Sequence, residues 1–568
     1  MRTLRRTLIA LFILLILGLG IVLYYVANPD LPSYRKPEKL HYLEQWSPAL
    51  RQTYYYTPQG TRVKGLRYDW FTALELPFST DRFASPEYLA RFGFLIDPEQ
   101  KPTALNPGNL PVGFTRHSDA QSATQYLDIS CAACHTGELR YQGQAVRIDG
   151  GPALHSLAST VPTLRGGGFG QALGMSMAFT YYNPLKFSRF ADSVLGEEHS
   201  DEDYDRLRHE FKAVLARMLG TAYNDWRRGL YPTEEGFGRT DAFGRIANSV
   251  FGDAIDSSNY RIANAPVSYP HLWDIWKFDW VQWNGSAMQP MARNIGEALG
   301  VGATLQLTQA DGQPVAESER YASSVRLRDL HTLEETLKQL KPPTWPEPVF
   351  GEIDLHLASQ GRALFSENCA YCHAPDPKPK SERLAQSRDP EWRMRIVPTR
   401  IIGTDPTAAD NIADHRFDIS KLKWSKSELG KLDVRLFGAS SDQLDLHSIS
   451  SAKGLAYITA YVENRAYRDA GIQPRERWRM DGYGLPIGVQ ENAATRPGRW
   501  TGSGPPAIPA QRLSAHAVSV ALTHNRTAGP ILGRQLRVRP RASWLYGCRI
   551  PGRLPVRYPH YRQRQPRT

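Results

Sequence analysis

Two short cysteine–histidine motifs constrain this chain more than any other feature of its sequence. The first, C-A-A-C-H, occupies residues 131–135, and the second, C-A-Y-C-H, occupies residues 369–373. The 568 residues include only five cysteines, so the two motifs hold all of them except Cys548. With cysteine this scarce, one such pentapeptide arises by chance with odds of roughly one in a thousand. The repeated motif therefore indicates a specific chemistry.

C-x-x-C-H is the attachment pattern of a c-type haem, in which two thiols bond to the vinyl groups and the adjacent imidazole binds the iron. We therefore predict two covalently bound haem c groups, with His135 and His373 as iron ligands. The predicted haem-binding residues are Cys131, Cys134, His135, Cys369, Cys372 and His373.

Two other chemistries of paired cysteines fit the sequence less well. A zinc site has no role for the histidine that follows each pair, and Cys134 and Cys369 are 235 positions apart. A thioredoxin-like redox pair requires a βαβ context and is not expected twice with the same trailing histidine. Both alternatives are disfavoured relative to haem.

The excess of basic over acidic residues is confined to the C-terminal end of the chain. The formal net charge is +12, but no Asp, Glu or Lys follows Glu491, whereas 14 arginines do. Without these arginines, residues 1–491 hold 55 basic and 57 acidic residues. The body of the protein is therefore near neutral, and we predict no nucleic-acid partner.

The N-terminal residues predict a membrane anchor. The run Leu8–Ala27 is uncharged, and as a helix it would span about 30 Å. Arginines precede the run and two tyrosines stand near its end, which predicts a cytoplasmic N-terminus. We expect a single-pass inner-membrane protein with the bulk of the chain in the periplasm. A cleaved signal peptide is the alternative, but no A-x-A pattern follows the run.

The predicted fold class is mainly α: two cytochrome c-like haem domains with loop-rich elaborations, preceded by one transmembrane helix. Helices are expected at 197–220, at 357–374 and at 452–468, and a short hairpin is expected after the first motif. In the second of these helices, Leu357, Leu364 and Phe365 are expected to form one apolar face. The predicted units are an anchor (1–27), an N-terminal extension (28–114), a first haem domain with a helical insert (115–345), a second cytochrome c domain (350–490) and an Arg/Pro-rich tail (492–568).

Beyond the motifs, several segments carry a family resemblance. They resemble the bacterial di-haem cytochrome c peroxidase superfamily, and most of all its branch of cytochromes related to rubber oxygenase A. The segments are GLRYDWFTALELPFS, NPGNLPVGFTRH, YLDISCAACHTGEL, SYPHLWD, RNIGEALGVGA and IIGTDP. The resemblance covers roughly residues 40–490. It implies a mostly helical protein in which one haem reacts with O2 or peroxide and the other relays electrons.

The resemblance makes a haem-dependent oxidoreductase the leading hypothesis. Its implied partners are a small-molecule oxidant, O2 or peroxide, and a redox donor or acceptor protein, with the inner membrane contacted by the N-terminal helix. Because fold and cofactor are shared by enzymes of different activity, the substrate is not implied. A non-catalytic electron-transfer cytochrome is the alternative, and it requires six-coordinate iron in both haems.

Further site residues can be named only as candidates. His155 is a possible additional iron ligand, and Met394 and Met480 are possible ligands of the second haem. Each of the three also fits an ordinary core or surface position.

Two catalytic candidates lie within and after the segment that begins at His271. Trp273 leads a predicted helical stripe with Trp276, Trp280 and Trp283, which could carry electrons or could be an aromatic core seam. Glu297 is the candidate acid–base group, because peroxide cleavage needs a proton moved between two oxygens and related peroxidases use a glutamate.

The tail allows two readings, a basic disordered arm or a shifted reading frame. The resembled family continues with a motif close to P-Y-L-H-N-G-S-V-P-T-L, which is missing here. Residues 507–517 can be encoded so that a one-base offset spells that motif, which favours a frameshift. Cys548 would then be accidental.

Overall fold

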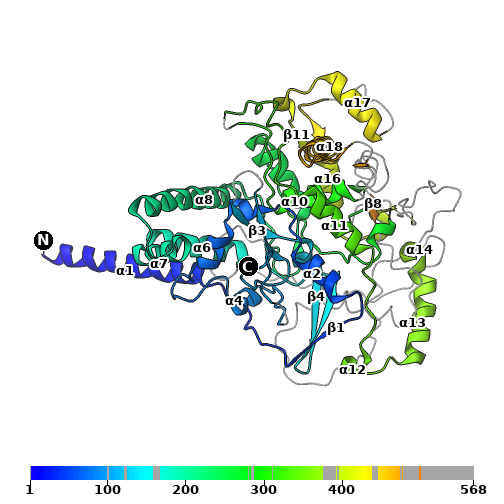
Figure 1. Cartoon of the computed structure of the whole chain (residues 1–568), viewed down its shortest axis with the longest axis horizontal. Helices are drawn as coiled ribbons and strands as arrows, with labels where there is room; N and C mark the ends of the chain where they lie inside the picture. Colours follow the sequence, from blue (N-terminus) through cyan, green and yellow to red (C-terminus); the bar gives the residue numbers. More distant parts are fainter. Residues whose placement is uncertain are drawn as a thin grey trace.

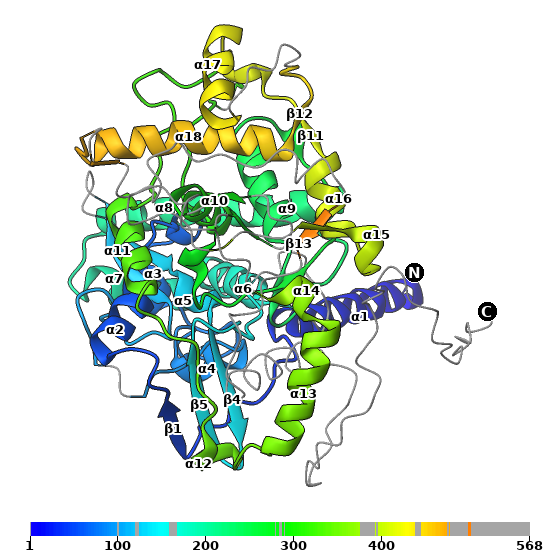
Figure 2. The ribbon, with the colours of Figure 1, turned by 90° about the vertical axis from the view of Figure 1, so that its right-hand side faces the viewer.

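The computed structural model describes residues 2–98, 101–119, 124–157, 167–278, 280–282, 287–288, 290–309, 311–374, 392, 396–437, 445–473, 476–477 and 498–500 (Figures 1 and 2). About half of this part is helical, and it also contains several small sheets. The predicted fold class, mainly α with a transmembrane helix, is therefore wrong. The sheets arise because short strands pair around the first motif and at loop ends, where local contacts do not favour helix.

Helices up to residue 260 are α1 (Arg2–Ala27), α2 (Pro48–Tyr56), η1 (Arg62–Gly65), α3 (Tyr68–Ala73), α4 (Pro86–Arg91), α5 (Cys131–Cys134), α6 (Phe169–Tyr182), α7 (Pro184–Leu195), α8 (Asp201–Arg228), α9 (Ala242–Ala247), η2 (Asn248–Asp253) and η3 (Ser257–Asn259). The later ones are η4 (Ile275–Lys277), α10 (Met291–Val301), α11 (Leu327–Leu337), α12 (Glu347–Phe350), α13 (Leu355–Asn368), α14 (Ala370–His373), α15 (Thr399–Ile402), α16 (Thr407–Asp414), η6 (Ser420–Leu422), α17 (Lys426–Phe437) and α18 (Ser451–Asp469).

Strands are short. They are β1 (Lys39–Tyr42), β2 (Phe114–Ser118), β3 (Gln125–Ile129), β4 (Thr136–Tyr141), β5 (Gln144–Asp149), β6 (Arg239–Thr240), β7 (Val267–Ser268), β8 (Trp280–Val281), β9 (Ala287–Met288), β10 (Ile396–Pro398), β11 (Arg416–Phe417), β12 (Ile449–Ser450) and β13 (Gly498–Trp500).

The hairpin predicted after the first motif is confirmed. β4 begins directly after His135 and pairs antiparallel with β5, and β1 adds to β5 in parallel. Gln142 and Gly143 connect the strands with φ angles of 47° and 79°. Positive φ at both turn residues matches the right-handed twist of the strands, which explains the tight connection. The hairpin therefore starts where the motif ends.

One hydrophobic core is built from phenylalanines of the N-terminal third. The ring of Phe169, at the start of α6, lies within 6.2 Å, centroid to centroid, of five other rings. These rings belong to Phe71, Phe83, Phe92, Phe94 and Phe114, all of them buried. The helix predicted in the charged insert is confirmed as α8, which buries Leu207 and Phe211 here and exposes its charged face.

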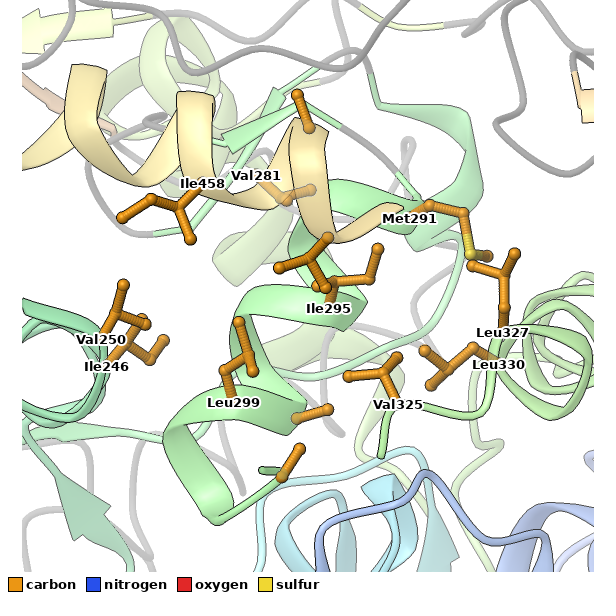
Figure 3. Close-up of a cluster of buried hydrophobic side chains, with 14 of the residues drawn as sticks. Ile246, Val250, Val281, Met291, Ile295, Leu299, Val325, Leu327, Leu330 and Ile458 are labelled. Atoms are coloured by element: carbon orange, nitrogen blue, oxygen red, sulfur yellow. The ribbon is translucent and has the colours of Figure 1, made fainter. Parts of the chain in front are cut away.

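The second core surrounds α10. Ile295 and Leu299 of this helix lie between Ile246 and Val250 on one side and Leu330 on the other, and Ile458 of α18 lies above them in the view of Figure 3. The same cluster includes Trp392, Phe417 and Tyr457. Residues on both sides of the predicted boundary between the haem domains, 345–350, thus share one core; the boundary itself stays a prediction.

The predicted membrane anchor over residues 1–27 is wrong. Within the described residues, no helix has both the length and the apolar character that a bilayer span requires. The last turn of α1 packs on the protein: Gln171 of α6 donates to the Val26 carbonyl at 2.9 Å, and Ala27 is 1% exposed. The prediction of a single-pass inner-membrane protein with its bulk in the periplasm depended on that anchor and is wrong for the same reason.

The helix predicted before the second motif is confirmed as α13. The apolar side chains expected on one of its faces, however, are not buried against another element. Leu357 and Leu364 are 49% and 56% exposed, and no residue of α13 is buried. Helical spacing of apolar residues predicts a helix, whereas burial requires a partner element in contact with that face.

We expect Phe169→Ala to lower the free energy of unfolding by about 3–5 kcal/mol, because it removes a buried ring and leaves a cavity among five others. Urea denaturation followed by near-ultraviolet circular dichroism measures the change. Tyr223→Ala is the matched control, because Tyr223 is 61% exposed on α8; it should stay within about 0.5 kcal/mol of wild type. Equal effects of the two substitutions would contradict the assigned core.

Candidate haem site

The first motif is a single helical turn held by backbone hydrogen bonds. The amide of Ser130 donates to the Gly113 carbonyl at 2.8 Å, and its hydroxyl donates to the Tyr55 carbonyl at 3.1 Å. At the other end, the Ala153 amide donates to the Cys134 carbonyl at 3.0 Å. Segments from three parts of the chain therefore fix the position of α5.

The two faces of the motif differ in exposure. Ala132 and Ala133 are buried, one in each hydrophobic core, whereas Cys131, Cys134 and His135 are partly exposed. The alanines thus anchor the turn, and the two cysteines and the histidine keep part of their surface accessible. Covalent attachment of the predicted haem would need such access.

The close packing of the alanine face depends on a glycine that sequence reasoning did not single out. A Cβ atom on Gly113 would lie 2.3 Å from the Ala133 amide nitrogen, and Gly113 has φ +86°. Only glycine fits both the contact and the backbone angle. The available signal was the V-G-F step directly before β2.

His135 is oriented as an iron ligand would be. Its Nδ1 lies 2.7 Å from the Pro270 carbonyl oxygen, which can only accept, so Nδ1 carries the proton and Nε2 keeps its lone pair. Burial lowers the pKa of His135 to about 4, against the opposing effect of the Pro270 hydrogen bond. A hydrogen-bonded second nitrogen is the usual arrangement of a metal-binding histidine, so these residues fit a haem iron.

His155 and His135 share a neighbour, Tyr269. His155 is 0% exposed, and neither of its ring nitrogens has a hydrogen-bond partner among the described residues. Its ring stacks on that of Phe94, with 5.1 Å between the centroids. The Tyr269 ring lies 5.1 Å from the His155 ring and 6.1 Å from the His135 ring, centroid to centroid. Burial lowers the pKa of His155 to about 3. A buried neutral imidazole with two unsatisfied nitrogens suits a ligand or a pocket residue.

Glu297, the acid–base candidate, is one of the acids whose charge reaches the thiols of the motif; Glu334 also acts on Cys131. Glu297 lies on α10, is partly buried, and accepts a hydrogen bond from Gln282 at 3.0 Å. Burial raises the pKa of the Cys134 thiol to about 12, and the negative charge of Glu297 adds to this. Burial also raises the pKa of Glu297 itself, opposed by Arg293. The structure therefore brings this candidate next to the motif.

The predicted tryptophan stripe is wrong. Residues 275–277 form only η4, and Trp280 belongs to β8, so the tryptophans do not share one helical face. Asp274 has φ +59° in the left-handed region, which interrupts an α-helix. Trp273 is buried and donates from Nε1 to the Asp149 carbonyl at 2.8 Å, and its indole stacks on His271. Trp283 lies outside the described residues.

The second motif is described less fully. Cys369 stands between the end of α13 and the start of α14, His373 ends α14, and both are partly exposed. The side chain of Cys372 and the residues Met394, Met480 and Cys548 lie outside the described part. In that part, no group of three or more His, Cys, Asp or Glu side chains is placed to hold a metal ion.

Sequence reasoning also missed Tyr54 and Pro270. The Tyr54 hydroxyl donates to the His135 carbonyl at 2.7 Å across 81 positions of sequence, and Pro270 lies 135 positions away. Pro270 lies in SYPHLWD, one of the segments that carry the family resemblance, but neither this segment nor the three successive tyrosines indicate a contact with His135.

Comparison with known proteins adds relatives of unassigned function. The chain is 37% identical over 460 residues to the uncharacterized protein y4iJ of Sinorhizobium fredii, a match that covers 73% of this chain and 72% of that protein. It is 27% identical over 150 residues to the uncharacterized protein y4iM of the same organism, covering 26% of each. A scan against protein-family models found no match.

We expect Gly113→Ala to destabilise the protein by at least about 2 kcal/mol more than Gly196→Ala. Both glycines have positive φ, +86° and +92°, so both substitutions strain the backbone. Only at Gly113 does the new methyl collide with α5, because nothing lies within 4 Å of a Cβ on Gly196. Urea titration of the two variants measures the difference, and equal losses would contradict the packing of the alanine face.

Proposed function

The chain belongs to the family of the uncharacterized protein y4iJ, and for this member we propose a haem-dependent oxidoreductase with two covalently bound haem c groups. In this proposal, one haem is attached at Cys131 and Cys134 and reacts with O2 or peroxide. The other is attached at Cys369 and Cys372 and relays electrons to or from a redox partner protein.

The observation that carries the proposal is the state of His135. Its Nδ1 donates to the Pro270 carbonyl at 2.7 Å, which leaves Nε2 with a lone pair. Two cysteines with partial exposure precede it on the same turn. A zinc site would need three protein ligands with a water, or four, and the described residues contain no such group. A haem needs only two thiols and one or two axial ligands.

The chain's own residues have separable roles at this site. A bound haem would supply the iron that exchanges electrons and takes up the oxidant. The Pro270 carbonyl orients the His135 ring, and Tyr54 holds the His135 carbonyl at 2.7 Å. Phe94 and Tyr269 exclude water from the ring of His155. Gln282 donates to Glu297 Oε1, which positions the carboxyl group to hold or give up a proton.

A non-catalytic electron-transfer cytochrome is the second candidate, and one observation favours it. His155 is fully buried and both of its nitrogens lack partners among the described residues. If it binds the iron as a sixth ligand, no position is left for O2 or peroxide.

Covalent haem content tests the basis of both candidates. We expect the pyridine haemochrome spectrum of the full chain to give two haems per protein, and one after Cys131→Ala with Cys134→Ala. The same substitutions at Cys369 and Cys372 should also leave one. Cys548→Ala is the matched control and should keep both. A wild-type protein without covalent haem would end the proposal.

Reaction with small ligands separates the two candidates. We expect cyanide to shift the optical and EPR spectrum of one haem, and Glu297→Gln to slow the reaction with peroxide by about 10²–10⁴-fold at unchanged haem content. Glu202→Gln, on the exposed face of α8, is the control and should react at the wild-type rate. Two low-spin haems whose spectra change with neither cyanide nor peroxide would identify an electron carrier.

A further inference from the structure

A cleft of about 690 Å³ opens beside the first haem motif. Its walls come from the segment before α2 and the first turn of that helix, from η4 with the residue before it, and from the segment that follows α11. A volume of this size is typical of a site for a small molecule. Neither the haem motifs nor the acid–base candidate lines it, so the proposed function leaves it unused.

Two tryptophans give the cleft flat apolar walls. Trp46 is held in place because its Nε1 donates to the buried Asp149 carboxylate at 2.9 Å. Trp276, on η4, also lines the cleft, and the Lys277 ammonium lies 5.2 Å from its ring centroid. Fixed indole rings provide faces on which an aromatic ring can stack.

The charged residues that line the cleft are mainly basic. Lys277, Lys338 and Lys341 face a single lining acid, Asp274, which pairs with Lys277 at 3.1 Å. Outside the lining, Glu335 pairs with Lys338 at 2.8 Å. Lys341 is exposed, and its ammonium makes no ion pair within the described residues. A positive excess therefore remains after both pairs are counted.

The cleft adjoins the site of His135 through one pair of rings. Trp46 lies 5.0 Å from Tyr54, centroid to centroid, and the Tyr54 hydroxyl donates to the His135 carbonyl. The Lys341 carbonyl and the Asp149 carbonyl both accept from Gln45, which ties the cleft wall to the hairpin that begins at the motif.

We propose that this cleft binds a small aromatic carboxylate, with the ring against the indoles that line the cleft, Trp46 and Trp276, and the carboxylate at Lys341 and Lys338. Stacking supplies the fit for the ring. The Lys341 ammonium, which makes no ion pair within the described residues, selects the anion over a neutral analogue, and Lys338 contributes less because it already pairs with Glu335. The proposal stands on binding alone and goes beyond the proposed oxidoreductase.

Calorimetric titration of the full chain with 2-naphthoate, at low salt, tests the site. We expect one saturable site, with 2-naphthamide binding at least about threefold more weakly because it lacks the charge. Lys338→Ala with Lys341→Ala should weaken 2-naphthoate about threefold to tenfold and leave 2-naphthamide unchanged. Lys212→Ala, an exposed lysine of α8, is the matched control and should bind 2-naphthoate as wild type does.

Three results would overturn the assignment: no saturable binding of 2-naphthoate, equal affinity for the neutral amide, or full affinity in the double lysine variant. Circular dichroism of each variant verifies that it is folded. Because the readout is the heat of ligand binding, it is independent of haem content, and the proposed function can fail or hold separately.

Discussion

The buried carboxylate of Asp149 holds together the elements that surround the first motif. It accepts hydrogen bonds from Trp46, Arg51 and Tyr55 at 2.9, 2.8 and 2.5 Å, and its backbone carbonyl accepts from Trp273. Arg51 and Asp149 are both almost fully buried, so each charge depends on the other for compensation. Through this one group, α2, the end of β5 and the segment before η4 are fixed relative to each other.

The position of the site follows from that arrangement. α2 carries Tyr54 and Tyr55. The Tyr54 hydroxyl donates to the carbonyl of His135, the last residue of the motif, and the Tyr55 carbonyl accepts from the hydroxyl of Ser130, directly before it. The segment anchored by Trp273 carries Pro270, whose carbonyl orients His135. The same hydrogen bonds fix Trp46 at the wall of the neighbouring cleft. The candidate haem site and the cleft thus depend on a common polar centre rather than on separate parts of the fold.

Local patterns in the sequence predicted local structure well. The turn at Gln142 and Gly143 produced the expected hairpin, and the amphipathic insert produced α8. Predictions that needed a partner surface were less successful. The tryptophan spacing suggested one helical stripe, but a left-handed residue at Asp274 breaks it. The apolar positions of α13 form a helix without a buried face, and the N-terminal apolar run did not become a membrane span.

The chemistry proposed here was determined by the sequence alone, because C-x-x-C-H places two thiols and an imidazole on one turn whatever the rest of the chain does. The orientation of that imidazole was decided only by the tertiary structure. Pro270 is 135 positions from His135 and Tyr54 is 81 positions away, and no periodicity or spacing records such contacts. The placement of His155 and Glu297 near the motif likewise depends on packing between distant segments. Hydrogen bonds and close contacts of this kind form only once both cores have brought those segments together.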